Sequence, residues 1–218
     1  MDRDVFLTRV GRAVMAAALP VPPTVSETLP ELDQTDLQTL FRARAMEVST
    51  VVHGPVTRHG TPRAIAGIAS GHDARTFIAW DDLPVSGIPS ALTSAGLTRI
   101  DAQVPSGEER SGHQLGYLRL DIGVTGADAG LAESGSIVLS HGPGRARMAS
   151  LVSEVHIAVL EVGLIERSLA HWARQNPGLP GDTANLVVVT GPSRTADIEL
   201  NLNLGVHGPR HLHVVLVS

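Results

Sequence analysis

The side chains best suited to chemistry stand in one stretch, Gly123–His156, which is rich in glycine, alanine and serine. Small residues let a ligand or another strand approach the backbone closely, because glycine carries no Cβ atom. Acidic groups precede a short apolar segment, Ile137–Leu139, and imidazole and guanidinium groups follow it. Polar groups at both ends of one strand predict a polar pocket at the edge of a sheet. The candidates in this pocket are Asp128, Glu133, Ser134, Gly135, Ser136, His141 and Arg145.

Each charged candidate has a chemical interpretation and a plainer one. Asp128 or Glu133 becomes a base or nucleophile if burial raises its pKa; otherwise the carboxylate caps a helix or accepts from a turn. Arg145 offers a guanidinium fork to a carboxylate or phosphate, and His141 can transfer protons near neutral pH. The alternative is an ordinary Gly-Pro-Gly turn with solvated arginines, Arg147 among them. We predict Glu133 and His141 as catalytic residues, and Arg145 and Asp128 as ligand-binding residues.

A second polar turn, Gly191–Thr195, follows an apolar strand and is expected to lead into a short helix. Backbone N–H groups at a helix N-terminus attract anions, so Ser193, Arg194 and Thr195 are further ligand-binding candidates. Two acidic residues in the next turn already complement the helix dipole. Simple capping by Ser193 or Thr195 is therefore an equally good interpretation.

The histidines near the C-terminus do not form a convincing metal site. His211 and His213 alternate on a strand and so share one face, and His207 lies nearby. No carboxylate accompanies these imidazoles, so we predict no metal ligands. His156 begins an apolar strand and is interpreted as a core histidine.

Composition excludes several classes of function. All 17 basic residues are arginine, so the chain has no lysine for a Schiff base or a phosphate-binding P-loop. It has no cysteine to ligate zinc or an iron–sulfur cluster. The net charge of −5 gives no reason to expect nucleic-acid binding. No signal-peptide pattern or long apolar run is present, so we expect a cytoplasmic location and no membrane span.

Hydrophobic periodicity predicts an α/β fold with a mainly parallel sheet covered on both faces. Residues 1–34 are expected to form a helix (4–19) and a proline-rich linker, an arm that packs on the core or on another subunit; residues 35–218 form the α/β domain. Further helices are predicted from Thr35, with Thr35-x-x-Gln38 as a capping box, near 61, and at 88–96, 107–116 and 163–175. Strands are predicted at 76–80, 98–102, 118–124, 137–139, 155–160, 186–190 and 212–217. Ligands bind beyond the carboxyl ends of parallel strands, where the turns 125–133, 140–147 and 191–199 would gather.

Two long segments carry a family resemblance. AESGSIVLSHGPGRARMASLVSEVHIAVL (132–160) is similar to the Ala-Glu-Thr-Gly-Thr…Arg…His-Ile signature of the LUD domain. GPSRTADIELNLNLGVHGPRHLHVVLV (191–217) resembles the C-terminal block of the same family. The chain is thereby identified as a member of the LUD-domain family, in its lactate-utilization protein C group. It departs from the pattern at Ser134 and Ser136, where threonine is common, and at His211, where an acidic residue is common.

The resemblance implies a three-layer α/β/α fold like that of sugar-phosphate isomerases and CoA transferases. It implies an accessory or substrate-handling role in oxidising L-lactate to pyruvate, with two iron–sulfur partner proteins that carry the redox centres. We expect this chain to bind no cofactor itself. It also implies two alternatives. Ala132-Glu133-Ser134-Gly135 resembles the nucleophile segment of CoA transferases, which would make Glu133 the nucleophile of an autonomous enzyme and Arg145 its carboxylate or phosphate anchor. The same pocket could instead serve a small-molecule sensor, and a homo-oligomer is compatible with either reading.

Overall fold

The computed structural model describes residues 3–16, 33–102, 120–178, 183–196, 202–204 and 207–218. The chain divides into two units, Met1–Glu31 and Leu32–Ser218. The first unit contains helix α1 (Arg3–Ala16), which agrees with the predicted first helix up to residue 16. The predicted linker and the predicted helix at 107–116 lie outside the described residues. All other elements belong to the second unit.

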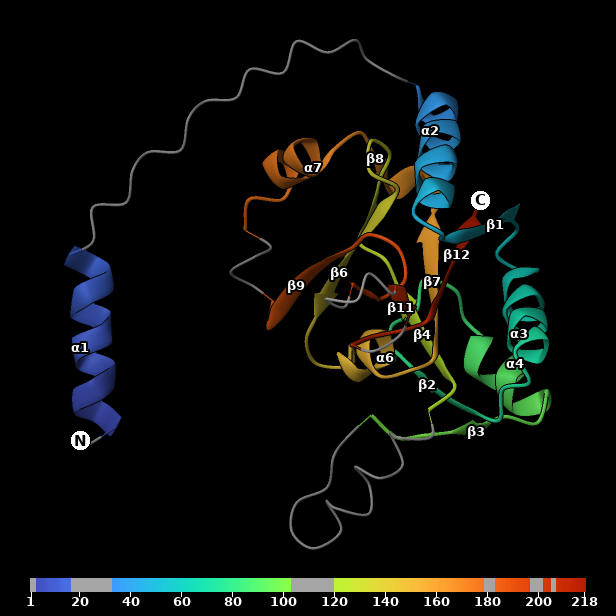
Figure 1. The fold of residues 1–218 in the computed structure, drawn as a ribbon, viewed down its shortest axis with the longest axis horizontal. Coiled ribbons are helices and arrows are strands. Elements are labelled where there is room, and N and C mark those ends of the chain that lie inside the picture. Colours follow the sequence, from blue (N-terminus) through green and yellow to red (C-terminus); the bar gives the residue numbers. More distant parts are fainter. Residues whose placement is uncertain (1–2, 17–32, 103–119, 179–182, 197–201, 205–206) are drawn as a thin grey trace, which may run out of the picture. The chain divides into compact units, whose positions relative to one another are not determined.

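A six-stranded sheet forms the centre of the second unit (Figure 1). All of its strand pairs are parallel, which confirms the α/β fold with a mainly parallel sheet. Apolar runs buried on both faces, as in the middle of this sheet, are typical of parallel strands. In spatial order the strands are β1 (Val51–Val56), β12 (His211–Val217), β7 (Val155–Glu161), β4 (Ile122–Gly126), β2 (Thr76–Ala79) and β3 (Thr98–Arg99).

Two layers cover the faces of this sheet. On one face, α3 (Thr61–Gly71) and α4 (Ile88–Ser94) pack through Ile65 and Leu92 against alternate strand residues such as Val215. On the other face lie α2 (Gln34–Glu47), α6 (Met148–Leu151) and part of a second sheet. The third layer of the expected three-layer fold therefore mixes helices with strands. Gly123 allows α6 to lie close to β4, since a Cβ atom there would come within 1.7 Å of the Ala149 carbonyl oxygen.

The second sheet has the order β8-β5-β6-β9 and carries most of the stretch around residues 128–141. Its strands are β8 (Ile165–Glu166), β5 (Ala129–Leu131), β6 (Ser136–His141) and β9 (Asn185–Val189). The β5–β6 and β6–β9 pairs are antiparallel. Helix α7 (Leu169–Gln175) buries Trp172 on this sheet against Ala129, Leu131 and Val138. A short helix η1 (Val162–Leu164) precedes β8, and β10 (Arg194–Ala196) pairs with β11 (Leu202–Leu204).

Three predicted elements are corrected by the structure. Helix α2 begins at Gln34, and its N-cap is Asp33, whose side chain accepts from the Asp36 N–H at 2.8 Å; the expected Thr35 capping box is wrong. The predicted helix 163–175 is instead η1, strand β8 and the shorter helix α7, because Ile165 and Glu166 pair with β5 and Ser168 caps α7. The turn at 191–193 leads into strand β10 rather than a helix.

Strand β1 was not predicted from the sequence, because His53-Gly54-Pro55 interrupts its apolar pattern. Proline is tolerated at a sheet edge, and β1 is an edge strand. Arg42 on α2 donates to the Val52 carbonyl at 2.9 Å and the Gly54 carbonyl at 2.5 Å, so a charged side chain covers backbone acceptors of this edge. Within the described ranges, no helix has the length and apolar character needed to cross a membrane.

Candidate functional site

Arg145 is the centre of the most developed polar site. Its Nε donates to Asp82 Oδ2 at 2.6 Å, and its Nη1 donates to Asp128 Oδ1 and to Ser140 Oγ, both at 2.8 Å. Burial opposes the guanidinium charge, but the hydrogen bonds that Arg145 donates to the Asp82 and Asp128 carboxylates outweigh it and raise the pKa of Arg145 above its ordinary value. The turn 140–147 and the turn after β4 thus meet, as their positions predicted.

Trp80 supports this ion-paired group from below the guanidinium. The Arg145 Cζ atom lies 5.1 Å from the centre of the Trp80 ring, within the range of a cation–π contact. The indole Nε1 donates to the Ala146 carbonyl at 3.1 Å, which fixes the ring beside the turn that carries Arg145. The Asp81 N–H also donates to the Gly144 carbonyl at 2.9 Å. The end of β2 and the Arg145 turn are therefore joined by backbone and side-chain contacts.

Asp128 is oriented by the backbone around it. Its Oδ2 accepts from the Ser140 N–H at 2.5 Å, and its own N–H donates to the Val138 carbonyl at 2.9 Å. Its side chain is only 19% exposed, whereas that of Asp82 is 50% exposed. Asp128 is thus a fixed partner of Arg145, and Asp82 is the partner that solvent or a ligand can reach.

A cleft of about 300 Å³ opens beside this ion-paired group. It lies at the carboxyl ends of β2, β4 and β7, where ligands bind in parallel sheets. Its charged lining consists of Arg145 and three carboxylates, those of Asp82, Asp128 and Glu161, the last of which pairs with Arg58. The full lining is Trp80, Asp82, Pro84, Gly126, Ala127, Asp128, Arg145, Glu161 and Leu164. Pockets for small molecules range from roughly 300 Å³ upward, so this cleft suits a small polar ligand.

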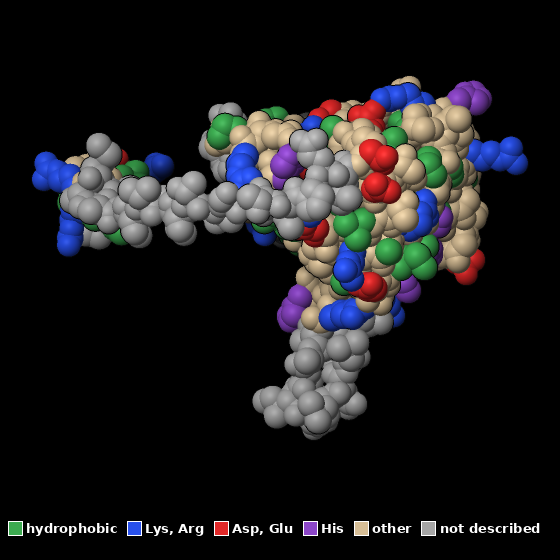
Figure 2. Space-filling view, turned by 90° about the horizontal axis from the view of Figure 1, so that it is seen from above, with side chains coloured by type: hydrophobic (Ala, Val, Ile, Leu, Met, Phe, Trp, Pro, Cys, Tyr) green, Lys and Arg blue, Asp and Glu red, His purple; other side chains and the backbone are tan. Residues whose placement is uncertain are grey.

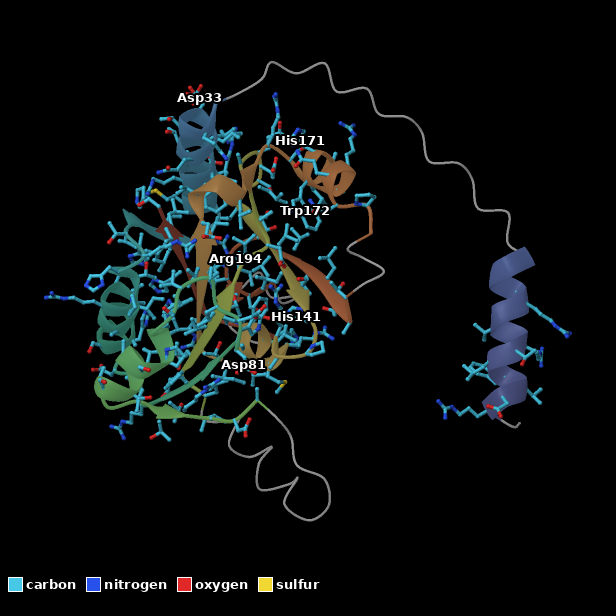
Figure 3. The ribbon with its side chains drawn as sticks, turned by 180° about the vertical axis from the view of Figure 1, so that it is seen from behind. Asp33, Asp81, His141, His171, Trp172 and Arg194 are labelled. Atoms are coloured by element: carbon cyan, nitrogen blue, oxygen red, sulfur yellow. The ribbon has the colours of Figure 1, made fainter. Side chains whose placement is uncertain are left out.

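His141 lies behind the cleft rather than in its lining. The side chain is buried, its ring meets Trp80 edge-on at 5.6 Å, and Nε2 lies 3.1 Å from the Ser150 hydroxyl. Burial lowers its pKa, although the nearby Asn185 backbone opposes the shift. Nδ1 has no partner of good hydrogen-bond geometry in the described part of the chain. His141 is therefore a neutral imidazole at neutral pH. Figure 3 labels it together with Asp81.

Glu133 is not brought together with Arg145. It lies in the turn between β5 and β6, while Asp128 and Ser140 stand at the other end of that hairpin. Its side chain is 40% exposed and accepts from Arg167 Nε at 2.9 Å. The pairing of Glu133 with Arg145 in one site does not occur in this chain, and a catalytic role for Glu133 stays a prediction.

The serines and glycine of the signature pack against the rest of the fold. Gly135 has φ +64°, and a Cβ atom there would lie 2.2 Å from the Ala45 nitrogen on α2. The Ser136 hydroxyl donates to Ser134 Oγ at 2.8 Å and lies 2.7 Å from the Thr190 hydroxyl. These contacts join the hairpin to α2 and to the end of β9, which accounts for small residues at these positions.

Ser193, Arg194 and Thr195 lie apart from the cleft lining. The Ser193 N–H donates to the Pro209 carbonyl at 2.8 Å, and Arg194 donates to the Ser49 hydroxyl. Thr195 is opposite Asn203 in the β10–β11 ladder. Since β10 replaces the expected helix, the argument for anion binding at a helix N-terminus does not hold here.

A cluster of histidines lies near the start of β12, on the sheet face that α3 covers. His213 Nδ1 lies 2.9 Å from His53 Nε2, and His213 Nε2 lies 2.9 Å from His72 Nε2. The His72 ring also packs against His211, at 4.9 Å between ring centres. His213 uses its two nitrogens for two different neighbours. In the part of the chain that the structure describes, no three His, Asp or Glu side chains are arranged to hold a metal ion.

Sequence reasoning missed Trp80, Asp82, Arg58 and Glu161. Asp81-Asp82 directly follows a strand that was predicted, so position beyond a carboxyl end was an available signal for Asp82. Glu161 likewise directly follows a predicted strand, 155–160. Arg58 follows β1, which was not predicted, and it gave no such signal.

The fold and the cleft define an α/β protein with a polar site at the carboxyl edge of a parallel sheet. The sequence profile of the LUD domain matches residues 40–217, and the chain belongs to this family. The structure is similar to the crystal structure of a DUF162 family protein from Deinococcus radiodurans, with a TM-score of 0.62 and 23% sequence identity, over 86% of this chain and all of that one. At that identity the likeness concerns the fold alone.

Several similar proteins are named lactate utilization protein C. The protein from Halalkalibacterium halodurans is 33% identical over 186 residues, which cover 79% of this chain and 76% of that protein. The protein from Shouchella clausii is 29% identical over 88% of this chain and 83% of its own length. The match to the Exiguobacterium protein reaches 41% identity but covers only 46% of this chain and 45% of that protein.

Proposed function

We propose that this chain is a lactate-utilization protein that handles substrate, or acts as an accessory subunit, in a system that oxidises L-lactate to pyruvate. The observation that carries this proposal is the 33% identity to a lactate utilization protein C over 79% of the chain. The match in the Shouchella clausii protein extends the same likeness to 88% of the chain. The proposal includes a cytoplasmic location.

The Arg145 cleft is the proposed site for the organic acid. Nη1 and Nε of Arg145 are occupied, but Nη2 donates to no described residue, which leaves its two N–H groups for a carboxylate. Asp82 is half exposed, and such exposed ion pairs contribute little stability. A ligand carboxylate can therefore replace Asp82 beside Arg145 while Asp128 and Ser140 keep the guanidinium in place. Glu161 also lines the cleft and pairs with Arg58 through Oε1, so its other carboxylate oxygen can accept from the ligand's hydroxyl group.

The redox part of the reaction belongs to partner proteins in this proposal. Oxidation of L-lactate to pyruvate releases two electrons and two protons, so an electron acceptor is required. The chain contains no cysteine to hold an iron–sulfur cluster. Iron–sulfur partner proteins would accept the electrons, and this chain would bind or deliver the acid.

One observation keeps a transferase-like activity as a second candidate. Glu133 is 40% exposed on a surface turn, so a large acyl-CoA could reach it. The idea rests on a CoA-transferase-like fold and on the Ala132–Gly135 segment, and it places the reaction away from Arg145. Incubation with acyl-CoA and then borohydride should modify Glu133. A peptide that stays unmodified in mass spectrometry rejects this candidate.

Gene deletion tests the lactate proposal. A strain that lacks this gene should fail to grow on L-lactate as the sole carbon source but grow normally on pyruvate. The wild-type gene should restore growth, and the tagged protein should co-purify with iron–sulfur proteins. Normal growth of the deletion strain on L-lactate would exclude the proposed role.

A further inference from the structure

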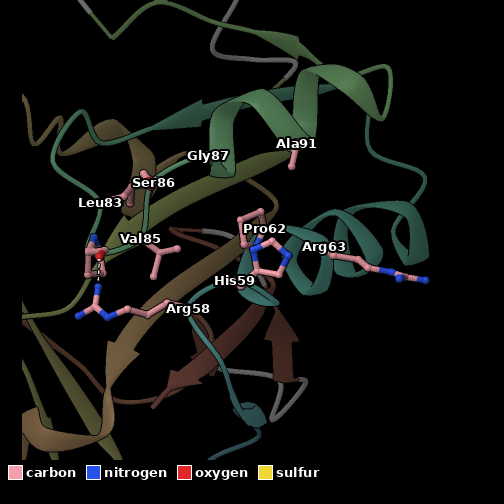
Figure 4. A pocket seen from close by; sticks show the side chains of 10 residues that line it. Arg58, His59, Pro62, Arg63, Leu83, Val85, Ser86, Gly87 and Ala91 are labelled. Carbon is pink, nitrogen blue, oxygen red and sulfur yellow. Dashed lines mark hydrogen bonds between the residues drawn. The ribbon is translucent and has the colours of Figure 1, made fainter.

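A second and larger hollow, of about 790 Å³, lies between α3, α4 and the loop that follows β2 (Figure 4). Arg58, His59 and Arg63 supply its basic lining, and no acidic residue from the described part of the chain lines it. Its remaining wall is mostly apolar and is formed by Pro62, Leu83, Pro84, Val85 and Ala91, with Ser86 and Gly87 between them. The hollow thus combines cationic groups with an apolar surface.

The cationic groups of this hollow are largely uncommitted. Arg63 and His59 are exposed and make no hydrogen bond or ion pair with any residue in the described ranges. Arg58 donates to the Pro84 carbonyl at 2.7 Å and pairs with Glu161. The side chains of Arg63 and His59 are therefore free to bind an anion, while Arg58 is anchored.

The two neighbouring hollows differ in charge. The smaller cleft is lined by three carboxylates and Arg145, whereas the larger hollow is lined by two arginines and a histidine. Pro84 lines both, and the Arg58–Glu161 ion pair stands between them. Figure 2 shows arginine and acidic side chains interspersed on the face seen from above, so charge of one sign does not cover that face. The basic lining of the larger hollow therefore differs from the mixed charge of the surrounding surface.

We propose that this hollow binds a phosphate-bearing organic molecule, with Arg63 and His59 beside the phosphate and Val85 and Ala91 against its apolar body. The Arg63 guanidinium supplies paired N–H donors that match phosphate oxygens, whereas Arg58 is held on the other side of the hollow by Pro84 and Glu161 (Figure 4). The volume of about 790 Å³ exceeds what a bare inorganic ion needs and leaves room for the organic part. The site goes beyond the proposed lactate role and does not depend on it.

Calorimetric titration with phenyl phosphate and with inorganic phosphate tests the proposal. Phenyl phosphate should bind wild-type protein at one site and more tightly than inorganic phosphate, because its ring contacts the apolar wall. Arg63→Gln should weaken phenyl phosphate binding about tenfold, the loss expected for one charge-assisted hydrogen bond. Ser86→Glu places a carboxylate in the hollow and should weaken binding at least as much. Both substituted residues are exposed, so both variants should fold.

Arg44→Gln is the matched control, since Arg44 is an exposed helix arginine on α2, which covers the other face of the sheet. It should bind phenyl phosphate like wild type. The site is rejected if no saturable binding occurs up to about 10 mM, or if Arg44→Gln and Arg63→Gln lose the same affinity. Equal affinity for phenyl phosphate and inorganic phosphate would show that the apolar wall does not contact the ligand. None of these outcomes involves lactate, so failure here leaves the gene-deletion test to decide the proposed function separately.

Discussion

At the carboxyl end of the six-stranded sheet Arg145 keeps its charge, whereas near the start of β12 the imidazole of His213 is held neutral. Arg145 is surrounded by opposite charges, and Asp82 and Asp128 raise its pKa. Burial is the main cause that lowers the pKa of His213, and the like charges of neighbouring His53, His72 and His211 add to it, so that the pKa falls to about 4. Titratable groups are concentrated at both ends; among the described residues, compensated charges lie beside a cleft at the carboxyl end and not near the start of β12. This difference is why the cleft, and not the histidine group, carries the proposed ligand site.

The largest expected effect is a loss of stability in acid, caused by the buried histidines near the starts of β12 and β7, which we call the histidine end of the sheet. His213 has a pKa of about 4 and buried His156 a pKa of about 3, both below the ordinary 6.5. The unfolded chain therefore binds these protons more tightly, so stability is fully present above pH 6.5 and falls as the pH drops toward 4 and then 3. The loss from His213 should be roughly 3 kcal/mol.

Urea unfolding between neutral pH and pH 4 measures this slope. Burial is the main cause that lowers the pKa of both His53 and His72. Among the charged neighbours, Arg42 lowers the pKa of His53 further, whereas Glu154 raises that of His72 and so opposes the shift. His213→Asn should flatten the slope, and His171→Gln, at an exposed histidine on α7, should retain it. Equal slopes in wild type and His213→Asn would show that the histidine end is not the acid-sensitive one.

The next largest effect is a loss of stability on substitution of Arg145, at the carboxyl end of the six-stranded sheet. Arg145→Gln leaves Asp128 and Asp82 close together without their cation, and should lower the free energy of unfolding by about 2 kcal/mol at neutral pH. Arg99→Gln is a matched control because it removes only the exposed pair with Asp81, with side chains 44% and 66% exposed. Its cost should stay within about 0.5 kcal/mol. If the two variants lose the same stability in urea, Arg145 is an ordinary surface pair and the contrast between the two ends fails.

The smallest effect on stability is expected at Glu133, which belongs to neither end. Glu133→Gln removes the charge of a partly exposed pair with Arg167, with side chains 40% and 19% exposed, but keeps an amide oxygen that can accept from Arg167. It should change the free energy of unfolding by less than about 1 kcal/mol. The prediction that Glu133 is catalytic requires this stable variant to lose growth on L-lactate. Growth at the wild-type rate in a complemented deletion strain would remove Glu133 from the catalytic candidates.

Strongly apolar segments made much of the fold predictable. The segments Val155–Leu160 and Leu212–Val217 are buried on both faces and were predicted as strands. Helix α3 was predicted as a helix from Thr61-Pro62 at its start. The two-residue strand β8 could not be predicted, because Leu164, Ile165, Leu169 and Trp172 fit a helical spacing and only contact with β5 reveals the strand. Local pattern is weaker than tertiary pairing in such short elements.

The site was predictable in its parts but not in its assembly. Asp128, His141 and Arg145 were chosen for their residue types and for their places beside turns. That Arg145 pairs with Asp82, 63 residues away, depends on the order of strands in the sheet. Strand β6 lies between Glu133 and Arg145 and separates them. Long-range placement brings His53 and His72 to His213 from elements that carry no metal-binding pattern. Sequence spacing contains no direct information on these contacts.

Ligand binding at Arg145 tests the central claim most directly. Calorimetric titration should show L-lactate and pyruvate binding to the wild-type protein at one site, with competition between them. Arg145→Gln should weaken both by at least about tenfold, because it removes the Nη2 donors offered to the carboxylate, while Arg99→Gln should bind like wild type. Unchanged affinity in folded Arg145→Gln protein, or no saturable binding of either acid to wild type, would contradict the assignment of this cleft.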